Sequence, residues 1–245
     1  MSKQNKIKVF KTVEELAEYI CVLLQTKSGN IPEGKFMSVA LSGGSTPKKL
    51  FNYISSQEAT DINWKKIKLF WGDERCVPPD NDESNYEMTK QNLLTNIDIP
   101  IENIFRILGE NEPEKEAIRY ARILGENLEK ANGFPKFDIV FLGLGDDGHT
   151  ASIFSGNTSL FNATNFCEAV KHPKSNQSRI TIIGPVINNA DVVIFLVTSK
   201  SKANIVAQLL NNDEEMELPA SLVNPASGNL FWLLDTDAAE LLDNK

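Results

Sequence analysis

Five short apolar runs recur along the chain, and longer amphipathic stretches separate them. The runs cover residues 39–41, 67–71, 137–142, 191–197 and 230–234 and are rich in Val, Ile and Phe. Runs of this length and composition predict strands that are buried on both faces of a sheet. Because amphipathic stretches alternate with them, we expect an α/β fold with a mostly parallel sheet covered by helices.

Local signals predict where several helices begin. Thr12 to Glu15 and Ser84 to Glu87 fit the capping box, and Pro47 suits the first turn of a helix. With 39–41 as the first strand, there is room for only one helix before it. No linker interrupts the 245 residues, so we expect a single domain over 1–245.

Charge and cysteine content exclude several classes of protein. The net charge is −8, the isoelectric point is about 5.0 and the lysines are dispersed, so nucleic acid is not an expected partner. The amino terminus lacks the apolar core of a signal peptide, and no run of about 18 apolar residues occurs, which predicts a cytoplasmic protein without a membrane partner. Cys21, Cys76 and Cys167 are widely spaced and are expected to be free thiols. The acidic segment 213–217 is expected to be a solvated loop.

The segment LSGGSTP at 41–47 follows the first apolar run and precedes a helix that we expect to begin at Pro47. Glycines let an anion approach the backbone, and the free N–H groups and positive dipole of a helix start favour phosphate. The segment is neither a P-loop nor a complete G-x-G-x-x-G motif. It predicts an anion site, or else a turn that only needs small residues.

The segment WGDER at 71–75 places Asp73, Glu74 and Arg75 consecutively after another apolar run. In a phosphosugar site, Arg75 would donate to an oxyanion, and Asp73 would act as a base or orient one. The alternative is a cluster of surface salt bridges. Arg179 and Lys202 also lie at strand boundaries, where they would complete a phosphate clamp or remain solvated surface charges.

The segment GLGDDGHTASIF at 143–154 follows the run FDIVFL and carries His149, one of two histidines in the chain. The unperturbed pKa of histidine is about 6.5, so this side chain can take and return a proton at neutral pH. Its position after a buried strand, beside Asp146 and Asp147, predicts a catalytic base. His172 is expected to be a loop residue, and no ligand spacing predicts a metal site.

Together these segments, with SRIT, TSKSKA and LPASLVNP at 218–225, closely resemble the 6-phosphogluconolactonase family over nearly the whole chain. The resemblance implies a three-layer αβα fold with a modified Rossmann-like sheet. It also implies hydrolysis of 6-phospho-D-glucono-1,5-lactone to 6-phospho-D-gluconate, the second step of the oxidative pentose phosphate pathway, without a cofactor. The partner would be this small phosphosugar lactone. The oligomeric state, monomer or dimer, stays open.

The resemblance also implies a role for each matching residue. His149 matches the general base, Arg75 an arginine near the reacting end, and Asp73 and Asp147 acidic positions near the histidine. The phosphate would be bound by the loop and its cationic partners, namely Gly43, Gly44, Ser45, Thr46, Arg179 and Lys202. Neutral His149 would take a proton from the attacking water, and Arg75 or a nearby backbone N–H would stabilise the oxyanion.

Two other functions share these features. A glucosamine-6-phosphate deaminase would have a similar phosphate loop and histidine, but that family carries a glutamate where this chain has Phe154. A sugar-phosphate sensor of a transcription regulator would need a DNA-binding segment, and none is evident.

Overall fold

A seven-stranded sheet forms the centre of the computed structural model, which describes residues 6–56, 61–211 and 218–242. The strand order is β1-β12-β11-β8-β2-β3-β5, and every pairing within this sheet is parallel. Its strands are β1 Lys6–Phe10, β2 Met37–Leu41, β3 Ile67–Trp71, β5 Ile104–Phe105, β8 Ile139–Leu142, β11 Val192–Val197 and β12 Leu230–Asp235. All residues of β2, β8 and β11 are buried, as their unbroken apolar runs predicted.

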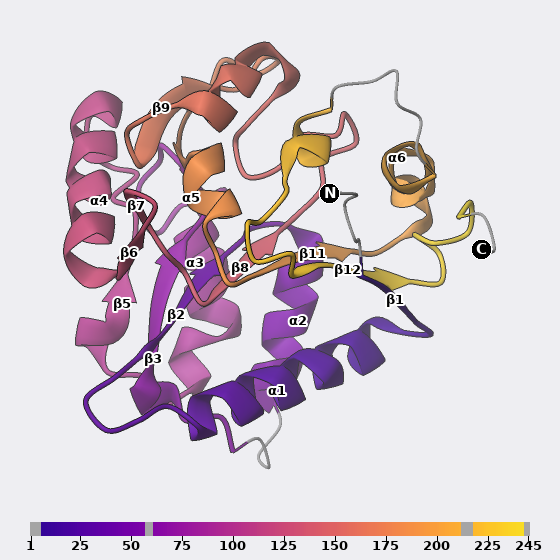
Figure 1. The fold of residues 1–245 in the computed structure, drawn as a ribbon, viewed down its shortest axis with the longest axis horizontal. Coiled ribbons are helices and arrows are strands. Elements are labelled where there is room, and N and C mark those ends of the chain that lie inside the picture. Colours follow the sequence, from indigo (N-terminus) through magenta and orange to yellow (C-terminus); the bar gives the residue numbers. More distant parts are fainter. Residues whose placement is uncertain (1–5, 57–60, 212–217, 243–245) are drawn as a thin grey trace.

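Helices cover both faces of the sheet and confirm the predicted α/β class (Figure 1). In this view α1 and α2 lie below the sheet, whereas α4 and α5 lie above it. The helices are α1 Val13–Gly29, α2 Ser45–Ser56, α3 Asn85–Asn92, α4 Pro113–Asn127, α5 Gly184–Asn188 and α6 Ala203–Leu210. Two predicted starts are confirmed: Thr12 accepts from the N–H of Glu15 before α1, and Ser84 accepts from the N–H of Glu87 at the start of α3.

Three predicted boundaries were wrong. The first strand is β1, not 39–41. It has no apolar run because Lys6 and Lys8 occupy positions where their side chains pack over aromatic rings. Helix α2 begins at Ser45 rather than Pro47, because proline is tolerated throughout a first turn. Strand β8 begins at Ile139, since the side chain of Asp138 accepts from Ser38 in place of a ladder bond.

The order of the central strands places two distant loops together. The chain proceeds from β2 through β3 to β5 on one side, and from β8 through β11 to β12 on the other. The loops after β2 and β8 therefore leave the same edge of the sheet at the point where the strand order reverses, which is where open α/β sheets bind ligands.

A second, antiparallel sheet was not predicted. It consists of β4 Asp73–Arg75, β10 Ser178–Ile182 and β9 Cys167–Lys171, in that order. Two-residue strands β6 Lys130–Ala131 and β7 Phe134–Pro135 form a small hairpin. In the described part of the chain, no helix has both the length and the apolar character needed to cross a bilayer. The acidic segment 213–217 lies outside the described residues.

Candidate active site

A cavity of about 300 Å³ opens where the loops after β2 and β8 meet. Nine of the ten residues predicted for the site line it: Gly43, Gly44, Ser45, Thr46, Asp73, Arg75, His149, Arg179 and Lys202. The tenth, Asp147, reaches the cavity through its hydrogen bond to His149. Residues as far apart along the chain as Gly43 and Lys202 thus converge on one space.

The loop after β2 forms the start of helix α2. Gly44 has a φ of 105°, a left-handed conformation that glycine adopts without strain, and its carbonyl accepts from the N–H of Lys48 to close the first turn. Thr46 is anchored by a 2.7 Å hydrogen bond to the hydroxyl of Thr198 after β11. This helix start faces the cavity, so its N–H groups and dipole can hold an anion there.

His149 is held by Asp147, two residues before it. Nδ1 of His149 lies 2.5 Å from Oδ1 of Asp147, and the backbone N–H of His149 also faces that oxygen at 3.3 Å. Burial alone would raise the pKa of Asp147, but the hydrogen bond and charge of His149 lower it below its ordinary value. Gly145 makes room for this pair, because a Cβ there would lie 2.1 Å from Nδ1. The contact leaves Nε2 as the imidazole nitrogen available for proton transfer.

Asp73 is buried and is fixed by two donors. Ser152 donates to one of its oxygens at 2.7 Å, and the amide of Asn85 donates to the other at 3.3 Å and to the Asp73 carbonyl at 2.9 Å. Asn85 lines the cavity, and both it and Ser152 were missed by sequence reasoning. Asn85 follows the predicted cap Ser84, which is the one sequence signal that could have found it.

Arg75 and Arg179 lie side by side, because their residues are direct partners in the β4–β10 pairing. Each has a buried Nε–H without a hydrogen-bond partner among the described residues. Burial and the neighbouring charge of Arg75 lower the pKa of Arg179. An unsatisfied buried donor costs about 1–3 kcal/mol, so the two Nε–H groups are a local cost that no described residue offsets.

Lys202 lies in a turn after β11, just before α6, and its Nζ is 2.6 Å from a carboxylate oxygen of Asp146. Asp146 is mostly exposed, whereas the side chain of Lys202 is only 23 % exposed. This pair is therefore a contact at the rim of the cavity, which the start of α2 also lines.

An aromatic side chain, Phe154, packs against His149. The ring of Phe154 lies 4.9 Å from that of His149 and 5.0 Å from that of His172, and Phe154 is buried. His172 follows β9 in a loop, as predicted, and burial together with the charge of Arg179 lowers its pKa. An apolar ring offers no proton at this position.

The described residues offer no cluster of side chains for a metal ion. Within the described ranges there is no set of three or more His, Cys, Asp or Glu side chains that could hold a metal ion. The cysteines are unpaired, and burial raises the pKa of Cys76 to about 11.

Comparisons with known proteins agree with this geometry. The family described as glucosamine-6-phosphate isomerases/6-phosphogluconolactonase matches residues 11–232. The chain belongs to this family. It is 42% identical to a 6-phosphogluconolactonase of Haemophilus influenzae, over 83% of this chain and 87% of the relative. It is 35% identical to a 6-phosphogluconolactonase of Synechocystis sp., over 99% of both chains.

A solved structure supports the family assignment and confirms the predicted fold. The 6-phosphogluconolactonase of Trypanosoma brucei superposes with a TM-score of 0.84 at 30% identity, covering 99% of this chain and 100% of that one. The resemblance stated from the sequence motifs is therefore confirmed at the level of the family and its fold.

Proposed function

We propose that the protein hydrolyses 6-phospho-D-glucono-1,5-lactone to 6-phospho-D-gluconate, the second step of the oxidative pentose phosphate pathway. One observation carries the proposal: a single cavity joins a helix start and two neighbouring arginines to a histidine held by a carboxylate. The relatives named as 6-phosphogluconolactonases support the choice of substrate.

The phosphate would bind at the start of α2. Backbone N–H groups of the Gly44–Thr46 turn supply neutral donors and the helix dipole, while Arg179 and Lys202 supply charge. Arg75 would join them, because it is the strand partner of Arg179 and also faces Gly44 and Ser45 in an adjoining hollow. We therefore assign oxyanion stabilisation to a backbone N–H of the cavity wall, the second of the two options that the sequence left open.

Hydrolysis would begin at the other end of the cavity. His149 takes a proton from water through Nε2 while the water oxygen bonds to C1 of the lactone. Asp147 holds the imidazole in the required tautomer and stabilises its charged form. The tetrahedral intermediate collapses with cleavage of the bond between C1 and the ring oxygen, and His149 returns the proton to that oxygen. The product acid then releases a proton to solvent.

Binding of the phosphate at a fixed position explains why a single general base is sufficient for hydrolysis. A sugar lactone is an activated ester, and a well-placed general base contributes about 10²- to 10⁴-fold. Anchoring the phosphate holds C1 near His149, which adds the advantage of proximity. Asp73, fixed by Ser152 and Asn85, would orient a sugar hydroxyl or the attacking water.

The deaminase alternative requires a second proton-handling side chain. Phe154 occupies the position beside His149 where that reaction would use a carboxylate, and its ring packs against the imidazole. We place the reaction in the cytoplasm, where three unpaired thiols remain reduced.

The proposal is tested by supplying freshly made 6-phosphogluconolactone and glucosamine 6-phosphate to the same enzyme preparation. Formation of 6-phosphogluconate is followed with a coupled dehydrogenase against the spontaneous rate, and ammonia release is followed in parallel. We expect lactone hydrolysis far above the uncatalysed rate and no ammonia. Ammonia release without lactone hydrolysis would establish the deaminase instead.

A further inference from the structure

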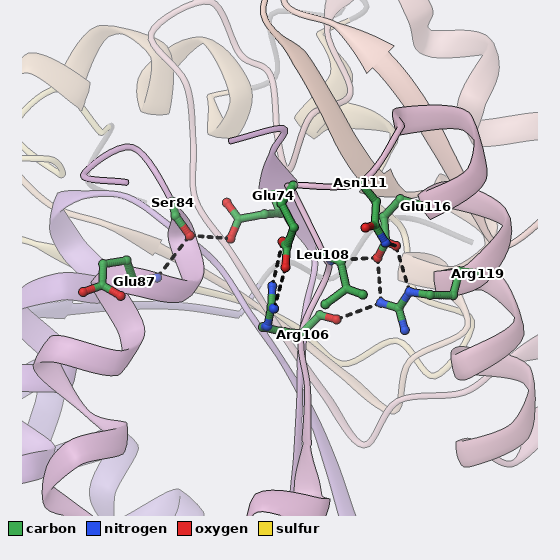
Figure 2. Close-up of polar contacts among 9 residues, drawn as sticks. Glu74, Ser84, Glu87, Arg106, Leu108, Asn111, Glu116 and Arg119 are labelled. Atoms are coloured by element: carbon green, nitrogen blue, oxygen red, sulfur yellow. Dashed lines mark hydrogen bonds and ion pairs between the residues drawn. The ribbon is translucent and has the colours of Figure 1, made fainter. Parts of the chain in front are cut away.

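Two buried carboxylates outside the cavity, Glu74 and Glu116, organise the segment that carries Arg75 (Figure 2). Neither lines the cavity. In Figure 2 they lie on either side of Leu108; Glu74 is hydrogen-bonded to Ser84, and Glu116 to Leu108, Asn111 and Arg119.

Glu74 closes the loop between β4 and α3. Its carboxylate accepts from the N–H groups of Arg75, Asn85 and Tyr86 at 2.7–2.8 Å and from the hydroxyl of Ser84 at 3.1 Å. Three of these donors belong to the start of α3, where a negative charge is favoured by the helix dipole. Glu74 therefore fixes Arg75 and Asn85, the two ends of the loop, next to one another.

Glu116, on α4, fixes a second loop in the same way. It accepts from the N–H of Leu108 at 2.7 Å, the amide of Asn111 at 2.9 Å and the guanidinium of Arg119 at 2.6 and 2.8 Å. The side chain of Glu116 is only 1% exposed. A buried carboxylate with this many donors holds its neighbours firmly, since each bond to a charged group is worth about 1.5–3 kcal/mol.

The two networks meet at the backbone of Arg75. Gly109 lies within the loop that Glu116 holds, and a Cβ on Gly109 would lie 2.3 Å from the carbonyl oxygen of Arg75 and 2.7 Å from that of Val77. The loop thus packs directly against the strand that delivers Arg75. In addition, the guanidinium of Arg106 lies 5.1 Å from the ring centre of Tyr86, a residue whose N–H binds Glu74.

We propose that Glu116 is a positioning residue for Arg75, acting through the Gly109 loop, and that it thereby sets the affinity of the site for the substrate's phosphate. This inference rests on the proposed function only in naming the substrate, because phosphate binding is measurable without turnover. A displacement of about 1 Å at a binding group is enough to change rates or affinities substantially.

The test compares Glu116→Gln and Gly109→Ala with the control Asp138→Asn. The Asp138 carboxylate also accepts two hydrogen bonds, but it lies at the opposite edge of the sheet, where β8 begins. The dissociation constant of inorganic phosphate is measured by calorimetry, and KM and kcat are measured with the lactone, all below the melting transition of every variant.

We expect Glu116→Gln and Gly109→Ala to raise the dissociation constant of phosphate, and KM, by about tenfold, equivalent to about 1.4 kcal/mol, while kcat falls much less. Asp138→Asn should leave phosphate affinity unchanged. In an Arg75→Gln background, Glu116→Gln should cause no further loss, because its effect passes through Arg75. Unchanged phosphate affinity in both test variants, or equal losses with and without Arg75, would overturn the inference. Failure of wild type to hydrolyse the lactone would refute the proposed function but leave the binding test valid.

Discussion

Replacing Gly43 with alanine would create a steric clash with one side chain, that of Asn85. Gly43 does not have the left-handed backbone of Gly44, so alanine would be tolerated there by the backbone itself. Its Cβ, however, would lie 1.8 Å from Oδ1 of Asn85 and 2.4 Å from Cγ. Ordinary contacts begin at 3.4 Å, so the amide of Asn85 must move by roughly 1.5 Å.

That movement breaks both hydrogen bonds from Asn85 to buried Asp73. Each is worth about 1–2 kcal/mol, so Gly43→Ala should lower the free energy of unfolding by about 2–4 kcal/mol. In an Asn85→Ala background the obstructing amide is gone, and the same substitution should cost less than about 0.5 kcal/mol. Gly156→Ala, where a Cβ meets nothing within 4 Å, is the matched control.

Urea denaturation followed by circular dichroism measures all four stabilities of this cycle. We expect a coupling energy of about 2 kcal/mol or more between positions 43 and 85. Equal destabilisation by Gly43→Ala in both backgrounds would show that Asn85 is not what requires glycine at this position.

Three further predictions concern the two ends of the cavity. His149→Ala should lower kcat by about 10²- to 10⁴-fold while phosphate affinity, measured by calorimetry, stays near that of wild type; near-normal turnover would remove His149 from the role of base. Arg179→Ala and Lys202→Ala should mainly raise KM for the phosphorylated lactone, and equal turnover of the non-phosphorylated lactone by wild type would refute the phosphate clamp. Asp147→Asn should lower the melting temperature, and the loss should be largest above about pH 4. Because His149 lowers the pKa of Asp147, the ionised carboxylate stabilises the fold above its unfolded-state pKa of about 3.9. This stabilisation is lost as the pH falls through the folded-state pKa. A difference from wild type that stays undiminished down to the most acidic pH at which both proteins remain folded would contradict this assignment.

The central strands and the cavity loops could be predicted because their signals are local. Unbroken apolar runs marked β3 and β11 almost to the residue, and a strand followed by glycines and a histidine marked the site. The carboxyl ends of parallel strands share one edge of a sheet, so the convergence of these loops followed from the fold class.

The missed features depend on partners that are distant in the sequence. Arg75 and Arg179 are neighbours only because β4 and β10 pair, and strands as short as β4 carry no periodic signal. Glu116 reads as an ordinary helix-surface charge, since its donors Leu108 and Asn111 precede the helix. Edge strand β1 was hidden because lysine stems pack where apolar residues are expected.

A crystal structure with 6-phosphogluconate bound would show whether one cavity holds the phosphate at α2 and C1 at His149. We predict that the phosphate lies on the N–H groups of Gly44–Thr46 with Arg75, Arg179 and Lys202 around it, and that the C1 carboxylate lies within hydrogen-bonding distance of Nε2 of His149. A product bound in the reverse orientation, or with C1 out of reach of His149, would contradict it.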